Sequence, residues 1–193
     1  MDNIIIIVVI IILLLFVSYI LYINQYSYQT QDQRNVHKAK AMVITCIDFR
    51  LIDDAVRFMN RLGYNNNYDE FIIAGASLGY NKTSPVPFCT EWKKTIDDHI
   101  GLSMTLHDIK EIIVIDHMYC GAYKKYYTDT GDSAINNGEF TSEQAEIDKH
   151  KENLQIFVTL IQERYPYLGV KAYLMDLHGN INDNETIIQI PSI

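Results

Sequence analysis

The sequence predicts an α/β domain with a mainly parallel β-sheet flanked by helices, preceded by an apolar N-terminal helix. Short apolar runs without polar alternation recur along the chain, as is typical of parallel strands covered on both faces. Amphipathic segments separate them, and this alternation implies right-handed crossover connections. In addition, 20 of the first 23 residues are apolar. These observations divide the chain into a transmembrane anchor (1–24), a polar linker (25–40) and an α/β domain (41–193).

The anchor is predicted from residues 4–23, which carry no charge and are long enough for a helix to cross about 30 Å of hydrocarbon. Neither a basic n-region nor a small-residue cleavage site is present, so an uncleaved anchor is favoured over a signal peptide. Arg34, Lys38 and Lys40 follow the span. Because Asp2 precedes it, the positive-inside rule predicts a single-pass membrane protein whose domain is cytoplasmic.

The first half of the domain is predicted to contain two strands and a helix. Ala41–Thr45 is a short apolar run and is expected to be a strand. A helix should follow and end at Gly63, and a second strand is expected over 71–74, before a loop of small residues. The inward stripe expected on this helix comprises Ile52, Val56, Met59 and Leu62.

Two further helices and two further strands are predicted in the second half. A helix is expected over 91–107, and 112–115 should form a central strand. Thr141 and Gln144 have the spacing of a capping box before a long helix, and a fourth strand is expected over 170–175. The expected inward stripes are Trp92, Ile96, Ile100 and Leu106 on the first helix, and Leu154, Phe157, Val158 and Ile161 on the second. His150 is expected on an exposed face of the second helix.

Charge and cysteine content exclude two classes of protein. The net charge of −8 leaves no basic surface to neutralise a phosphate backbone, so nucleic-acid binding is not expected. Three cysteines are too few for a disulfide framework. They are better explained as thiols in a reducing compartment or as metal ligands.

Three metal-binding side chains follow predicted strands. Cys46 comes after the first strand, and His117 and Cys120 come after the third. The carboxyl ends of parallel strands are where α/β folds build their sites. Two thiolates and an imidazole suit Zn²⁺, and three protein ligands with one open position are typical of catalytic zinc. His178, after the fourth strand, is the only similarly placed candidate for a fourth ligand.

The two motifs together resemble those of the β-class carbonic anhydrases. Cys-x-Asp-x-Arg is followed about 70 residues later by His-x-x-Cys-Gly, and the resemblance covers about 41–176. It implies that Cys46, His117 and Cys120 bind zinc and that Asp48 and Arg50 form the family's carboxylate–guanidinium dyad. It also implies a homodimeric lyase in which a zinc-bound hydroxide hydrates CO₂ to bicarbonate.

The dyad also has a physical rationale. A carboxylate two residues from a zinc ligand can orient the attacking water, and the planar fork of Arg50 can hold Asp48 in a bidentate pair. In part of the family the equivalent Asp becomes a fourth zinc ligand. The chain departs from the family pattern at Ile72 and Ile73, where many members have a polar pair, and at Met118 and Tyr119. The family's CO₂-orienting Gln has no evident counterpart.

Other functions stay open at this point. The same site on a more apolar pocket could hydrolyse carbonyl sulfide or carbon disulfide, and a membrane-tethered zinc-binding module without catalysis is a third possibility. A Cys–His nucleophile pair would give no role to Cys120. A phosphate-binding Cys-x5-Arg loop would need an arginine where Ile52 stands. Cys89 is expected to be a buried thiol.

Overall fold

The computed structural model describes the backbone of residues 2–26, 35–81, 83–176 and 188–190. Side chains are described over 5–21, 35–81 and 83–176. The chain forms two compact units, Met1–Val36 and His37–Ile193.

The first unit is the helix α1 (Asp2–Tyr26), formed by the apolar run at the start of the chain. Its described side chains are exposed. Among the residues that the structure describes, no helix has the length and apolarity needed to cross a membrane. The predicted transmembrane anchor is therefore not confirmed, and the cytoplasmic location of the domain stays a prediction.

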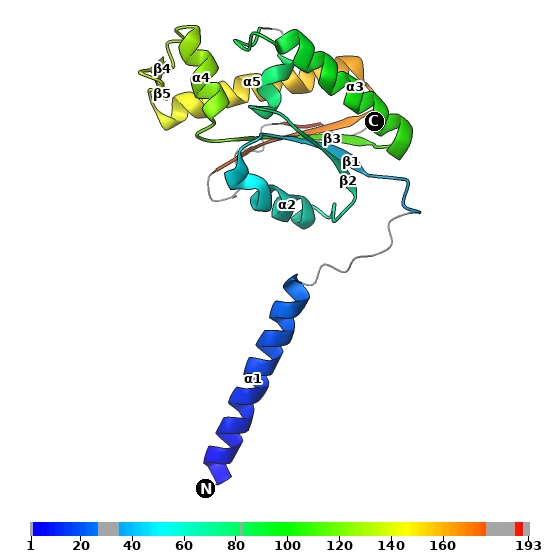
Figure 1. Ribbon diagram of the computed structural model, residues 1–193, viewed down its shortest axis with the longest axis vertical. Helices are drawn as coiled ribbons and strands as arrows, with labels where there is room; N and C mark the ends of the chain where they lie inside the picture. The colour runs from blue at the N-terminus through cyan, green and yellow to red at the C-terminus, as the bar shows by residue number, and fades with distance from the viewer. Residues whose placement is uncertain (1, 27–34, 82, 177–187, 191–193) are drawn as a thin grey trace. The chain divides into compact units, whose positions relative to one another are not determined.

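The second unit is built on one five-stranded sheet, in the order β2-β1-β3-β6-β7 (Figure 1). The first four strands in that order are parallel, and β7 pairs antiparallel with β6. The predicted mainly parallel sheet is confirmed. The strands are β1 (Ala41–Thr45), β2 (Tyr68–Ile72), β3 (Glu111–His117), β6 (Gly169–Met175) and β7 (Ile188–Ile190).

Helices cover both faces of this sheet. In Figure 1, α2 (Ile52–Arg61) lies on one face, and α3 (Cys89–His107) and α5 (Glu143–Arg164) lie on the other. Because β1 and β3 are central, their side chains are buried almost throughout, which explains their apolar sequences. The core on the α2 side includes Val43, Phe58, Met59 and Ile113, and the core on the opposite side includes Ile44, Ile96, Ile100, Leu154, Phe157 and Ile161.

A short helix, a hairpin and the edge strand β7 were not predicted. The helix α4 (Gly121–Asp129) has few apolar residues and buries only Tyr123 and Tyr127, so its periodicity is weak. A hairpin of β4 (Ile135–Asn136) and β5 (Glu139–Phe140) follows it. Asn137 and Gly138 both have positive φ there, and this Asn-Gly pair was the available signal for a tight turn.

Several predicted boundaries and stripes were wrong. Strand β2 begins at Tyr68 rather than at residue 71, because an edge strand can carry polar residues. Ile52, Leu62 and Leu106 are 57%, 39% and 61% exposed rather than inward. The buried face of α2 instead carries Phe58 and Met59, and that of α3 carries Ile96, Ile100 and Ser103. The N-cap of α5 is Ser142, whose hydroxyl accepts a hydrogen bond from the Ala145 amide, one residue after the predicted Thr141.

Candidate metal centre

The parallel pairing of β1 and β3 brings the two sequence motifs together. Thr45 is paired with Ile115, so Cys46 leaves β1 close to His117, the last residue of β3. Cys120 is the N-cap of α4, immediately after the same strand. The ligand atoms of Cys46, His117 and Cys120 all lie within 4.8 Å of one another. Three donors separated by up to 74 positions in sequence therefore meet at the carboxyl edge of the sheet.

His117 is oriented as a metal ligand would be. Its Nδ1 lies 2.9 Å from the carbonyl oxygen of Met118, to which it can donate a hydrogen bond. The imidazole is 2% exposed, and its Nε2 has no hydrogen-bond partner among the described residues. An unsatisfied buried polar atom is costly, and metal-binding histidines typically donate their other N–H to a carbonyl or carboxylate. The free Nε2 therefore fits a metal ion.

The thiols of Cys46 and Cys120 are hydrogen-bonded to each other. Their sulfur atoms lie 3.9 Å apart, and the amide of Gly75 donates a hydrogen bond to Cys46 Sγ at 3.3 Å. The hydrogen bond from Cys120 lowers the pKa of Cys46 to about 4, although burial opposes this shift. The same bond, together with burial, raises the pKa of Cys120. A divalent cation would allow both sulfurs to be thiolates, and a donor set of two thiolates and one imidazole suits Zn²⁺.

Asp48 and Arg50 form the bidentate pair expected from the sequence. Arg50 Nε donates to Asp48 Oδ1 at 2.9 Å, and Arg50 Nη2 donates to Oδ2 at 2.6 Å. The Arg50 amide adds a bond to Oδ1 at 3.0 Å, because Asp48 caps the 3-10 helix Phe49–Leu51. The guanidinium lowers the pKa of Asp48 to about 2, so this carboxylate is ionised at neutral pH. Its Oδ2 lies 3.9 Å from His117 Nε2, beside the three metal-binding atoms.

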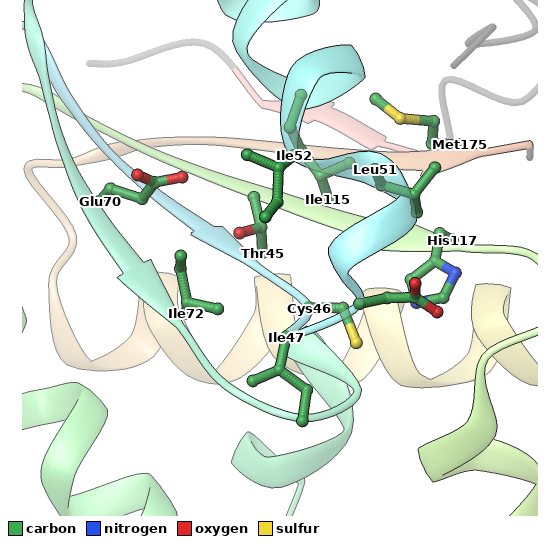
Figure 2. Close-up of a pocket in the computed structure, with 12 residues that line it drawn as sticks. Thr45, Cys46, Ile47, Leu51, Ile52, Glu70, Ile72, Ile115, His117 and Met175 are labelled. Atoms are coloured by element: carbon green, nitrogen blue, oxygen red, sulfur yellow. The ribbon is translucent and has the colours of Figure 1, made fainter. Parts of the chain in front are cut away.

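A small cavity of about 60 Å³ opens next to these residues (Figure 2). Cys46 and His117 lie at one end of it, and Glu70 lies at the other. Because about 10–15 Å³ of such space is enough for one water molecule, the cavity admits a molecule of a few atoms. Most of the wall is apolar, formed by Ile47, Leu51, Ile52, Ile72, Ile115 and Met175.

All five predicted site residues lie together at the carboxyl edge of the sheet. His178 falls outside the described residues. Cys89 is the first residue of α3 and is not part of the three-residue group.

Sequence reasoning missed a buried polar cluster behind the site. His150, expected on an exposed face, is completely buried and lies 3.0 Å from Asp116. The available signal was its spacing of four and seven residues from Leu154 and Phe157, which places all three on one helix face.

Comparison with known proteins finds two relatives in sequence and several solved structures with the same fold. No family model matches the chain. An uncharacterised protein of Rickettsia bellii is 36% identical over 148 residues, 77% of this chain and 83% of that protein. An uncharacterised protein of Rickettsia conorii is 35% identical over 159 residues, 82% of this chain and 77% of that protein.

Solved structures share the fold at low sequence identity. The β-carbonic anhydrase isoform I of Trichomonas vaginalis matches with a TM-score of 0.52 and 15% identity, over 92% of this chain and 97% of that chain. The β-carbonic anhydrase CcaA matches with a TM-score of 0.52 and 12% identity, over 83% of this chain and 79% of that chain. The chain thus has the fold of the β-carbonic anhydrases, and it belongs to the same protein family as the two uncharacterised Rickettsia proteins.

Proposed function

We propose that this protein is a zinc-dependent enzyme that hydrates carbon dioxide to bicarbonate. The observation that carries the proposal is the buried, unpartnered Nε2 of His117, which lies close to two cysteine sulfurs and 3.9 Å from the carboxylate of Asp48. This combines three zinc donors with a fixed, ionised carboxylate that can accept a hydrogen bond from the attacking water. A structural zinc site would have a fourth protein donor, and the described residues supply three.

Each residue of the site has a defined task in this reaction. When bound by Cys46, His117 and Cys120, zinc supplies Lewis acidity, which lowers the pKa of a coordinated water from about 15.7 towards neutrality. Asp48 accepts a hydrogen bond from the attacking water and directs its lone pair towards the substrate. Arg50 keeps Asp48 ionised and in place through two side-chain hydrogen bonds. The apolar wall of the cavity admits a small neutral molecule and limits competing water.

The test is a CO₂ hydration assay on the full-length protein with its metal content measured. We expect about one zinc per chain and rapid hydration in a stopped-flow pH-indicator experiment, with a rate that rises with pH. Removal of zinc by a chelator should abolish the activity, and added zinc should restore it. Stoichiometric zinc without CO₂ hydration would refute the proposal. In that case carbonyl sulfide and carbon disulfide should be tested, and inactivity on all three would favour a non-catalytic zinc-binding module.

A homodimer is part of the same proposal. Its support is a group of exposed apolar side chains near the cavity and the metal-binding residues, which a second copy would cover. Ile47, Phe49 and Ile72 are 63%, 81% and 49% exposed. Light scattering of the purified protein should give twice the mass of one chain, and a monomer at micromolar concentration would contradict this.

A further inference from the structure

Behind the metal site lies a buried polar cluster that the proposed reaction does not use. Asp116, Glu146 and His150 are 1%, 2% and 0% exposed. The Asp116 carboxylate accepts hydrogen bonds from the Ser77 amide at 3.0 Å, the Ser77 hydroxyl at 2.7 Å and the Tyr123 hydroxyl at 2.6 Å. Burial raises the pKa of Tyr123 well above 10, which keeps this hydroxyl a donor.

His150 lies between Asp116 and Glu146 without bridging them. Its Nδ1 lies 3.0 Å from Asp116 Oδ2, whereas its Nε2 lies 4.0 Å from Glu146 Oε1, beyond hydrogen-bond distance, and has no partner among the described residues. His150 and Glu146 are one turn apart on α5, so helix geometry holds their side chains side by side. What ties the Glu146 carboxylate to the metal site is a hydrogen bond from the segment between His117 and Cys120.

Glu146 contacts the segment between His117 and Cys120 at Tyr119, whose backbone is left-handed. The amide of Tyr119, between His117 and Cys120, donates a hydrogen bond to Glu146 Oε1 at 2.5 Å. Tyr119 has a φ of 60°, a left-handed conformation that bulky residues rarely adopt without support. The buried carboxylate supplies that support, because it binds the amide in this orientation of the peptide chain.

The carbonyl group of Tyr119 contacts Arg50, one member of the Asp48–Arg50 pair. Its carbonyl oxygen lies 3.5 Å from Arg50 Nη2, the same nitrogen that donates to Asp48 Oδ2 at 2.6 Å. A change in the Tyr119 backbone would move this acceptor and leave Arg50 held by Asp48 alone. The contacts therefore run from Glu146 through the Tyr119 backbone to Arg50 and then to Asp48.

We propose that Glu146 is a positioning residue for the Arg50–Asp48 pair and acts through the left-handed backbone of Tyr119. It does not touch the substrate or the metal-binding atoms. Its role is to fix where the guanidinium lies, and hence where the Asp48 carboxylate lies relative to the open metal position. The catalytic part of this inference rests on the proposed function, whereas the geometry of the metal site can be tested without any substrate.

The primary test compares Glu146→Ala with Glu146→Gln in the full chain. Glu146→Ala removes the acceptor and should retain one zinc per chain while kcat/KM for CO₂ falls by about 10- to 100-fold, the usual effect of losing a residue that supports a metal site. Glu146→Gln keeps an acceptor oxygen and should retain most of the activity. If Glu146→Ala does not fold, a folded Glu146→Gln protein that retains zinc but loses tenfold or more in rate would overturn the proposal.

Two further comparisons separate positioning from general stability. In an Arg50→Ala background, Glu146→Ala should cause no additional loss, because the two residues act through one path. Tyr119→Gly should restore much of the rate to Glu146→Ala, since glycine adopts positive φ without a supporting acceptor. Additive losses in the first comparison, or no rescue in the second, would contradict the inference.

A spectroscopic measurement makes the test independent of the reaction. With Co²⁺ in place of zinc, the visible absorption responds to any change in the groups around the metal. Glu146→Ala and Arg50→Ala should produce the same spectral change, whereas Glu146→Gln should match the wild type. If the wild-type protein binds cobalt but does not hydrate CO₂, the proposed function fails while these spectra still decide the role of Glu146. A changed spectrum in Arg50→Ala together with a wild-type spectrum in Glu146→Ala would refute that role.

Discussion

Replacing Arg50 by alanine should slow catalysis without removing the metal. The change deletes two side-chain hydrogen bonds to Asp48, of 2.9 and 2.6 Å. A hydrogen bond to a charged group contributes about 1.5–3 kcal/mol. Because the Arg50 side chain is 43% exposed, solvent screening favours the lower end of this range. About 1.5 kcal/mol corresponds to a roughly tenfold loss in rate.

The loss should exceed this figure if the released carboxylate also moves. Asp48 Oδ2 lies only 3.9 Å from His117 Nε2, so the freed side chain can reach the position meant for water. We therefore expect kcat/KM to fall by about 10- to 100-fold in a stopped-flow CO₂ assay. The zinc content should stay at about one per chain, since Cys46, His117 and Cys120 are unchanged.

A second arginine–aspartate pair provides a matched control. Arg57 pairs with Asp54 within α2, and its side chain is 62% exposed. Arg57→Ala should leave both zinc content and rate unchanged and should alter stability by no more than about 0.5 kcal/mol. Full activity in Arg50→Ala, or equal losses in both variants, would refute the assignment of the dyad.

Three further predictions concern the thiols and the core. Cys46→Ser should reduce zinc to well below one per chain and abolish hydration, so normal zinc content would contradict its role as a ligand. In zinc-free protein, Cys46 should react with iodoacetamide at a rate that changes little between about pH 5 and 8, because its pKa of about 4 leaves it a thiolate throughout; a rate that rises steeply over this range would contradict the lowered pKa. Phe157→Ala should cost about 3–5 kcal/mol in urea unfolding, whereas Leu106→Ala, at an exposed position, should cost no more than about 0.5 kcal/mol.

The sequence was sufficient to predict the four parallel strands of the sheet, with the first residue of β2 misplaced, and to bring five residues together at their carboxyl edge; the antiparallel strand β7 was not predicted. A parallel strand buried on both faces requires a continuous apolar run, and such runs mark β1, β3 and β6 directly. Because parallel strands share a carboxyl edge, polar residues that follow them are brought together. This geometry explains why Cys46 and His117 could be assigned to one site without a structure.

Other features depend on tertiary contacts that no local pattern reports. Ile52 has the spacing of a core residue, yet it is 57% exposed and lies on the wall of the cavity beside the metal-binding residues. Glu146 is a charged residue on a long helix, yet it is buried because its carboxylate accepts a hydrogen bond from the Tyr119 amide, a contact 27 positions away in sequence. The left-handed conformation of Tyr119 likewise has no signal in its residue type.

If Cys46, His117 and Cys120 bind one zinc ion with a fourth position open, X-ray absorption at the zinc edge of the purified protein should show it. We expect two sulfur neighbours at about 2.3 Å and two nitrogen or oxygen neighbours at about 2.0–2.2 Å. Cys46→Ser should remove one of the sulfur neighbours or the metal itself. A shell with four sulfurs, or with none, would rule out this zinc site.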